Sequence, residues 1–441
     1  MNMINVRRLT VMTFLGAGML SGISAQVSPL QVDTLKETKI PDQWDLQSCI
    51  DYAKEQNITI RKNRITAAST QIDVKTAKAA LFPSLSFSTS QQVVNRPYQE
   101  TSSRVSGSEI ISSNSKTSYN GNYGLNASWT LYNGNKRLKT IQQEKLNNQV
   151  AELDVATSEN NIQESIAQVY IQILYAAESV KVNESTLQVS IAQRDRGQEL
   201  LNAGSIAKSD FAQLEAQVST DRYQLVTAQA TLEDYKLQLK QLLELDGENE
   251  MNIYLPALSD ENVLAPLPTK KDVYIRALSL RPEIEASKLN VEASELGIGI
   301  AKSSYLPTIS LSAGIGTNHT SGSDFTFGEQ VKNGWNNSIG LSVSVPIFNN
   351  RQTKSAVQKA KLQYETSMLS LLDEQKTLYK TIEGLWLDAN SAQQRYAAAN
   401  EKLKSTQISY ELISEQFNLG MKNTIELLTE KNNLLQAQQE Q

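Results

Sequence analysis

Two stretches of the sequence, Ala77–Ser88 (AKAALFPSLSFS) and Ala301–Ser312 (AKSSYLPTISLS), share one pattern. In each, a helix-favouring run leads to a proline, and after the proline apolar residues alternate with small polar ones. A proline stops a helix, and strict alternation is typical of a strand with one apolar face and one wet face. The stretches lie about 224 positions apart, so they predict a duplicated helix-to-strand junction.

The duplication continues past these junctions. Trp129–Gly134 (WTLYNG) matches Val345–Asn350 (VPIFNN) at an offset of about 216, and the same offset relates Gly204 to Gly420. The difference of about eight residues falls in segments 95–118 and 319–334, which are rich in Ser, Asn and Gly. We expect both segments to be exposed loops.

Each repeat is therefore predicted to contain a helix, two strands and a long helical hairpin. The expected first helices span about 43–81 and 272–305, and the expected long helices span about 136–201 and 351–419, each followed by a further helix after its glycine. The four strands centre on Leu85–Thr89, Tyr123–Leu131, Ile309–Ile315 and Ile339–Ile347, with lengths of about 10–12 residues, which suits an outer-membrane crossing at a tilt. Taken singly, the strands also fit soluble half-buried hairpins, and the helices also fit a soluble coiled coil.

Composition excludes several classes of protein. The 441 residues contain 42 Lys+Arg and 47 Asp+Glu, a balance that does not suit binding dominated by phosphates, so no nucleic-acid partner is expected. With one His and one Cys, the chain is not expected to form a His-based metal centre, a Ser-His-Asp triad or an internal disulfide. We expect that the protein is not an enzyme and binds no cofactor or metal. Cys49 is expected to pack as a small apolar residue.

The N-terminus has the features of an export signal. Arg7 and Arg8 precede an apolar run over about 9–20, and small residues follow at Ser24 and Ala25. The alternative is a retained membrane anchor, although the run is shorter than the roughly 18 residues that a span requires. The expected divisions are a signal peptide at 1–25, an N-terminal extension at 26–42, the first repeat at 43–245, an equatorial linker at 246–271 and the second repeat at 272–441.

Four strands cannot close a barrel in lipid, because open edges leave backbone groups without partners. Two chains would supply eight strands and a filled interior, whereas three would supply twelve strands and room for a lumen. If the small polar face lines a pore, a trimer is required.

The chain resembles outer-membrane efflux proteins of the TolC family over nearly all of its exported part. The resemblance rests on a Trp-x-Leu-x-x-Cys-Ile-x-x-Ala motif at 44–53, the strand junctions at Pro83 and Pro307, the Arg281–Ile284 segment (RPEI), and the two hairpin tips, Leu200–Asp210 and Phe417–Glu426. It implies a mainly α fold with membrane β, in which duplicated long helical hairpins form a trimeric α-helical tunnel and each chain adds four strands to a twelve-stranded barrel.

The resemblance also implies partners and a location. They are a homotrimer with outer-membrane lipid around the barrel, a periplasmic adaptor (membrane fusion protein) at the hairpin tips, and an inner-membrane pump. The implied function is that of the outer-membrane channel of a tripartite efflux or type I secretion system, a passive conduit for small molecules or proteins. The alternative is a soluble periplasmic coiled-coil adaptor, for which a lipoyl-like β domain with a single hairpin is expected.

At the tips the resemblance implies roles for single residues. The residues implied to contact the adaptor are Gly204, Ser205, Ile206, Gly420, Met421 and Lys422. The residues implied to form the gate or constriction are Asp210, Phe417, Lys422 and Glu426. The family links an acid of the first tip, here Asp210, to a base of the second, here Lys422. Phe417 takes the place of the family's tyrosine and lacks its hydroxyl. The family also narrows its mouth with two acidic residues in the second tip helix, of which Glu426 keeps the first and Thr429 replaces the second. Without the resemblance, the glycines are turn residues, and Asp210 and Glu426 are acids favoured at helix N-termini.

The two repeats end differently. The first continues about 42 residues past Gly204, and the second ends 21 residues past Gly420. We expect the last helix to be incomplete at Gln441.

Overall fold

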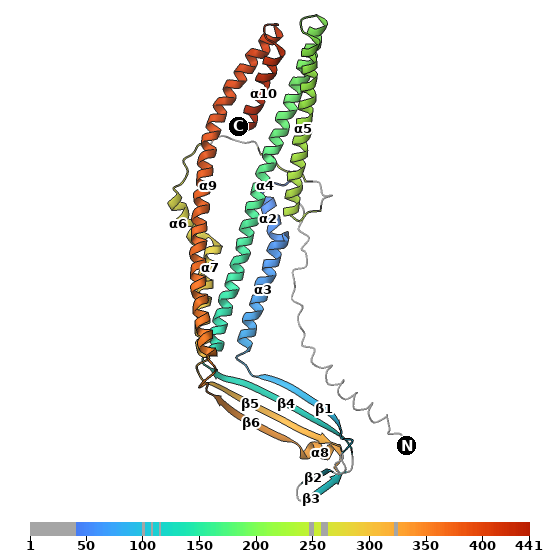
Figure 1. Cartoon of the computed structure of the whole chain (residues 1–441), viewed down its shortest axis with the longest axis vertical. Coiled ribbons are helices and arrows are strands. Elements are labelled where there is room, and N and C mark those ends of the chain that lie inside the picture. Colours follow the sequence, from blue (N-terminus) through green and yellow to red (C-terminus); the bar gives the residue numbers. More distant parts are fainter. Residues whose placement is uncertain are drawn as a thin grey trace, which may run out of the picture. The chain divides into compact units, whose positions relative to one another are not determined.

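The computed structural model of the chain describes residues 41–98, 102–106, 109–113, 116–246, 251–256, 263–321 and 325–441. The predicted signal peptide and nearly all of the predicted extension lie outside these residues, as do parts of the predicted linker. Residues 43–441 form one compact unit. Its elements, in chain order, are α2 (Leu46–Gln56), α3 (Ile58–Ala79), β1 (Ser84–Asn95), β2 (Ser102–Ser106), β3 (Glu109–Ser113), β4 (Thr117–Asn133), α4 (Lys136–Asn202), α5 (Lys208–Leu242), α6 (Lys270–Leu280), α7 (Pro282–Ser303), β5 (Thr308–Thr320), α8 (Phe327–Asn333), β6 (Asn336–Ser344), α9 (Gln352–Asn418) and α10 (Thr424–Glu440) (Figure 1).

The long helices are confirmed almost residue for residue. α4 and α9 each contain 67 residues, which corresponds to a length of about 100 Å. α5, with 35 residues, and α10, with 17, run back along them. Neither α4 nor α9 contains a proline, so nothing in the backbone interrupts the ladder of hydrogen bonds.

The first helix of each repeat, expected to be continuous, is broken in two. In the first repeat Asn57 ends α2 and caps α3, since its Oδ1 accepts the backbone N–H of Thr59 at 2.9 Å. Its Nδ2 donates to the carbonyl of Leu242 at 3.0 Å, which ties the break to the end of α5. In the second repeat Pro282 begins α7 directly after α6, because a proline suits the first position of a helix and not its interior.

The four predicted strands form one antiparallel sheet in the order β1-β4-β5-β6. They contain 12, 17, 13 and 9 residues, so β4 is longer than expected. β6 ends at Ser344, which places Val345 and Ile347 outside the strand that was expected to contain them. The expected loops are also partly structured, because segment 95–118 holds the β2–β3 hairpin and segment 319–334 holds α8.

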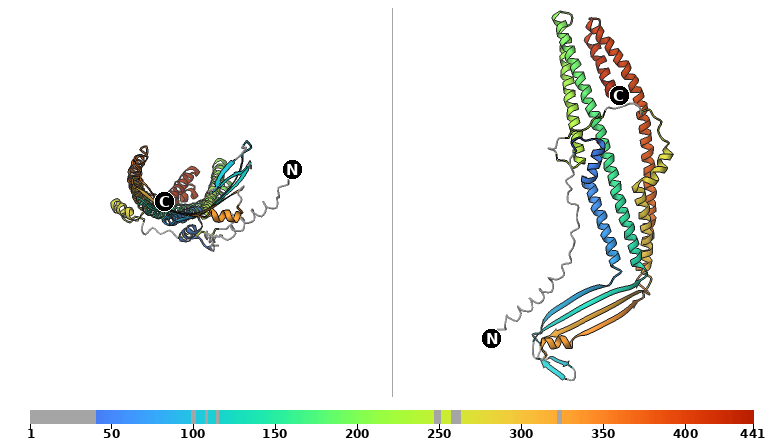
Figure 2. Two further views of the ribbon diagram at one scale, coloured as in Figure 1. Left: turned by 90° about the horizontal axis from the view of Figure 1, so that it is seen from below. Right: turned by 180° about the vertical axis from the view of Figure 1, so that it is seen from behind.

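The helices that adjoin the sheet lie side by side in the same order as its strands. α3 leads into β1, β4 into α4, α7 into β5 and β6 towards α9. α4 packs against α3 and α7, and α7 packs against α9. Seen from below, this part of the chain is a curved wall with α10 on its concave side (Figure 2). Side chains fix the junction, since the Trp129 indole donates to the carbonyl of Leu81 at 2.7 Å and Arg137 donates to that of Ala80 at 2.7 Å.

A small apolar core lies where α2 meets the middle of α4 and the end of α5. Trp44, Cys49, Ile166, Ile173 and Leu239 are among its fully buried members. The backbone of Trp44 bonds to that of Asn252 and Tyr254, both at 2.8 Å, so this core also holds the linker. Among the described residues, no helix is both long enough and apolar enough to cross a bilayer.

Candidate functional site: the hairpin tips and the two-faced sheet

Both hairpins turn at a glycine in the left-handed region. The φ angles are +75° at Gly204 and +73° at Gly420. The hydrogen bonds match at the two turns: Ser205 N–H reaches the carbonyl of Leu200 at 2.8 Å, and Met421 N–H reaches that of Gln416 at 2.8 Å. This is the pattern of a Schellman cap, which satisfies the last carbonyls of a helix and favours glycine.

The tips expose apolar side chains. Met421 is 70% exposed and its neighbour Leu419 is 75% exposed. Ser205 is exposed as well, and Ile206 is half-buried. The residues predicted for adaptor docking therefore form a partly apolar surface at the two turns, which suits contact with another protein.

Asp210 lies at the start of α5 and accepts the backbone N–H of Ala207 at 3.4 Å. Its carboxylate therefore stabilises the N-terminus of its own helix. This is the role expected of Asp210 if it takes no part in a gate. Within the described residues, the ion pair of Lys422 joins it to Glu426 and not to Asp210.

Glu426 likewise caps the N-terminus of its own helix, and it also forms an ion pair with Lys422. Its Oε1 lies 2.6 Å from Nζ of Lys422, and its Oε2 accepts the backbone N–H of Asn423 at 3.2 Å. The hydrogen bond from Lys422, with that from Asn423, lowers the pKa of Glu426 below its ordinary value. The carboxylate thus stays ionised at neutral pH, and one of its two oxygens, Oε1, contacts a cation of its own chain.

Phe417 differs from the other predicted gate residues because it is buried. It is 3% exposed, in the last turn of α9. A hydroxyl at this buried ring position would need a hydrogen-bond partner, which the phenylalanine does not require.

A buried polar cluster that the sequence patterns did not predict joins the two hairpins. Lys431 of α10 donates to Asp221 of α5 and to Ser190 of α4, and the Ser190 hydroxyl also bonds Asp221. The three residues are 3%, 1% and 2% exposed, respectively. Gln217 completes the cluster by donating to Oδ1 of Asp221 at 2.8 Å. Burial lowers the pKa of Lys431, and the facing carboxylate of Asp221 opposes that effect.

A signal for this cluster exists in the sequence. Leu214 and Val218 predict an apolar stripe on α5, and Asp221 takes its next position, three residues on. Likewise Lys431 sits midway between Leu427 and Leu435, at four-residue steps. A charge that interrupts an apolar stripe at a buried position requires a partner of opposite charge.

A second polar bond joins the hairpins nearer the tips. The amide of Gln193 on α4 donates to the hydroxyl of Tyr410 on α9 at 2.8 Å. Burial raises the pKa of Tyr410. The two hairpins are thus connected by polar contacts at two levels.

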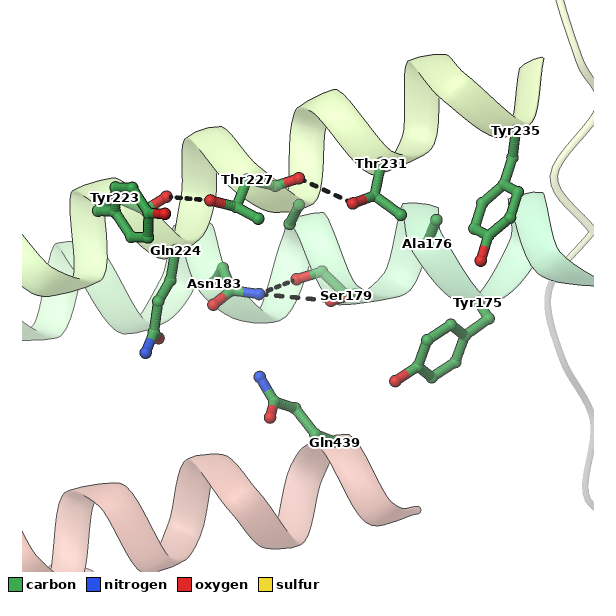
Figure 3. A pocket seen from close by; sticks show the side chains of 11 residues that line it. Tyr175, Ala176, Ser179, Asn183, Tyr223, Gln224, Thr227, Thr231, Tyr235 and Gln439 are labelled. Carbon is green, nitrogen blue, oxygen red and sulfur yellow. Dashed lines mark hydrogen bonds between the residues drawn. The ribbon is translucent and has the colours of Figure 1, made fainter. Parts of the chain in front are cut away.

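A pocket of about 290 Å³ lies between the first hairpin and the end of α10. Figure 3 shows Asn183 and Gln439 pointing toward each other across it, with Tyr175 and Tyr235 at one end and Tyr223 at the other. Asn183 Nδ2 donates to the carbonyl of Ser179 at 2.7 Å, so part of its polarity is already satisfied.

The sheet carries two chemically different faces in register. On one face, rows of small polar residues run across all four strands, as in Ser84, Ser128, Ser312 and Gly340. On the other face the rows are apolar, as in Leu85, Ala127, Ala313 and Ile339. Many of these apolar side chains are exposed, among them Leu85 at 69% and Ile339 at 79%.

The small polar face has little room for larger side chains. A Cβ on Gly314 would lie 3.0 Å from Oγ of Ser338, and one on Gly340 would lie 3.1 Å from Oγ of Ser312. Small residues on one face let the sheet curve toward that face. The alternation predicted from the sequence is therefore confirmed as far as Thr130 of β4 and Ser344 of β6, and the register aligns it across the sheet. Beyond Thr130 a bulge places Tyr132, and not the expected Leu131, opposite Ile309.

Comparison with known proteins agrees with this geometry. The family model described as outer membrane efflux protein matches residues 49–244 and 273–441. The outer membrane efflux protein BepC of Brucella suis biovar 1 (strain 1330) is 24% identical over 282 residues, which cover 64% of this chain and 59% of that protein. Outer membrane protein TolC of Escherichia coli (strain K12) is 23% identical over 300 residues, which cover 66% of this chain and 59% of that protein. The chain thus aligns with about three fifths of the length of these relatives.

Solved structures have the same fold. A crystal structure of CusC superposes with a TM-score of 0.74 at 19% identity, covering 89% of this chain and 87% of that one. The outer membrane protein VceC of Vibrio cholerae superposes with a TM-score of 0.74 at 16% identity, covering 90% and 91%.

Proposed function

The chain belongs to the outer membrane efflux protein family, and from that premise we propose that it is the outer-membrane channel of a tripartite efflux or type I secretion system. The proposed activity is passive conduction of small molecules or proteins, with no catalytic step and no cofactor. It would be located in the outer membrane of a Gram-negative bacterium, with its helices in the periplasm.

The observation that carries the proposal is the two-faced sheet at the end of the long helices. A surface of exposed leucine, isoleucine and phenylalanine side chains is stable against lipid and unfavourable in water. The opposite face, with its rows of Ser, Gly and Asn, suits a water-filled lumen.

Closure requires other copies of the chain. The sheet ends at β1 on one side and at β6 on the other, and unpaired strand edges in lipid are costly. Antiparallel pairing of β6 with β1 of the next copy would continue the sheet, and three copies would give twelve strands. We therefore propose a homotrimer with one continuous barrel and one helical tunnel.

Planar-bilayer recording tests the channel directly. Purified full-length protein should insert and give stepwise conductance, and chemical crosslinking in detergent should give a trimer. Protein that leaves the membrane fraction in a salt wash and never conducts would overturn the proposal. That outcome would favour the alternative, a soluble periplasmic adaptor.

We place adaptor docking at the two turns, on Gly204, Ser205, Ile206, Gly420, Met421 and Lys422. Their support is the exposed apolar surface around Met421. A Met421→Asp variant should lose binding to the cognate adaptor in a pull-down, whereas an equally exposed site away from the tips, Leu369→Asp at 66% exposure, should keep it. Equal binding by both variants would remove the assignment.

We place the gate at the same end, on Asp210, Phe417, Lys422 and Glu426, with the Ser190–Asp221–Lys431 cluster behind them. The cluster binds α10 to the first hairpin, so it opposes any outward movement of α10. Asp210→Asn and Lys422→Met should raise the conductance of the resting channel. Unchanged resting conductance in both variants would count against the gate.

A further inference from the structure

The short helix α8 is docked on the end of the sheet that lies away from the long helices. The hydroxyl of Thr317 donates to the carbonyl of Val331 at 2.7 Å, and the side chain of Gln330 accepts the backbone N–H of Thr320 at 2.9 Å. The ring of Phe327 meets that of His319 edge to face, with centroids 5.0 Å apart. Because β6 pairs with β5 only as far as Gly316, α8 occupies the part of β5 that β6 leaves open.

The register shows which face α8 covers. Thr317 and His319 have the same parity on β5 as Ile309, Leu311 and Ile315, so they point to the apolar face. Figure 2 agrees, since the view from below places α8 on the convex side of the curved wall. α8 therefore lies outside the proposed lumen, on the surface that the proposed function turns toward lipid.

The side chains around α8 suit a membrane boundary. Phe327 is 44% exposed and Trp335, two residues after the helix, is 57% exposed. Beside them the ring of Tyr119 meets that of His319 at 5.6 Å and its hydroxyl bonds Gln91, so polar atoms appear where the apolar rows end. Aromatic residues with polar atoms gather where acyl chains meet headgroups. Lys332, exposed in the last turn of α8, adds a cation that suits lipid phosphates.

The opposite boundary lies at the other end of the apolar rows. Trp129 pairs with Leu311 on that face and is 39% exposed. Eight residues of β5 separate Leu311 from His319, which is about 26 Å along a strand and about 20 Å at a tilt of roughly 40°. This is close to the apolar band of about 25 Å in outer-membrane barrels.

We propose that α8 is an interfacial anchor that lies in the outer leaflet of the membrane, with Phe327 and Trp335 among the upper acyl chains and Lys332 at the headgroups. The occupant of this surface is lipid. The inference rests on the proposed function, because it requires the sheet to span the outer membrane. It goes further in assigning a lipid contact to a segment outside the strands.

Depth-dependent fluorescence quenching tests the anchor. The full chain, Trp335→Phe, Trp129→Phe and Trp386→Phe are placed in vesicles of phosphatidylcholine and phosphatidylglycerol that carry a spin label at carbon 5 or carbon 12 of the acyl chain. Subtracting each variant from the unaltered protein isolates the emission of one tryptophan. Trp386 packs near Lys270 on the helical part and serves as the control away from the sheet.

The label at carbon 5 should reduce the Trp335 and Trp129 emission by about twofold, more than the label at carbon 12, because both rings belong at the boundary and not the centre of the bilayer. Trp386 should keep its emission. If Trp129 is quenched and Trp335 is not, the anchor is overturned while the membrane-spanning sheet stands. A second measurement with iodide, a quencher that stays in water, then distinguishes two arrangements of α8. Quenching of Trp335 by iodide shows that the helix lies in water, and no quenching shows that a neighbouring copy covers it. If neither ring is quenched, the sheet lies outside lipid and the proposed function fails with the anchor.

Discussion

Lys431 and Asp221 lie 210 positions apart in the chain, and their side chains form an ion pair that is removed from solvent. One belongs to α10 and the other to α5, so the pair joins the hairpin of one repeat to that of the other. Both charges would be costly at these positions if they were alone.

The first prediction concerns this pair. Lys431→Met or Asp221→Asn should each destabilise the helical part by about 3–5 kcal/mol, because each leaves one buried group without its partner. The double variant Lys431→Met/Asp221→Leu should recover most of the loss, since it leaves no buried charge. Urea unfolding followed by circular dichroism measures all three.

Lys402→Met is the matched control for the pair. It breaks an ion pair with Glu440 within the second hairpin, in which the side chains are 39% and 41% exposed. An exposed pair contributes at most about 1 kcal/mol. Equal losses for Lys402→Met and Lys431→Met would contradict the special role of the buried pair.

The second prediction concerns the tip glycines. Gly204→Ala and Gly420→Ala should each cost about 1–2 kcal/mol, because an alanine at φ near +75° is strained although no atom lies within 4 Å of the added Cβ. Gly384→Ala within α9 also meets open space, and there alanine should stabilise by up to about 1 kcal/mol. Thermal unfolding separates the two signs. A loss at Gly384 as large as at the tips would refute the backbone explanation.

The third prediction concerns pH at the tip. The pKa of Glu426 is lowered in the fold, so its contribution to stability is fully present above its unfolded pKa and is lost as pH falls through the folded pKa. Lys422→Met removes the larger cause and should shift this loss to higher pH. If Glu426 contributes to a cation-binding constriction, block of the channel by divalent cations should follow the same titration.

Glu426→Gln is the control for that titration. It keeps the shape of the side chain and should abolish both the block and its pH dependence between about pH 3 and 6. Block that persists unchanged in Glu426→Gln assigns cation binding to another group.

The fourth prediction concerns Cys49. Burial, with the charge of Asp45, raises the pKa of its thiol to about 12, so at pH 8 only on the order of one molecule in 10,000 carries the thiolate. The native protein should therefore resist maleimide for hours and react within minutes in denaturant. A Ser205→Cys variant, exposed at the tip, should react at once and sets the scale. Rapid labelling of native Cys49 would show that the core around Trp44 opens readily.

Much of the fold could be predicted because its signals are local. The long helices, the strands and the turns at Gly204 and Gly420 follow from proline placement, alternation and positive φ, each of which involves a few neighbouring residues. The helix breaks at Asn57 and Arg281 were missed, although an Asn cap and an Arg-Pro step are local signals too. At the predicted site, residue types indicated the exposed turns correctly. The partner of Lys422 was not predictable, because Asp210 and Glu426 are both acids near a helix start.

By itself, the sequence determined the long helices and the four strands of the main sheet, that they occur twice, and which side chains share a strand face. Only the tertiary structure decided the strand order β1-β4-β5-β6, the alignment of the small polar rows, the position of α8 against β5 and the pairing of Lys431 with Asp221. The reason is physical. Local periodicity fixes the conformation of a segment within a few residues, whereas contacts between segments more than 200 positions apart depend on how two packed backbones place their faces.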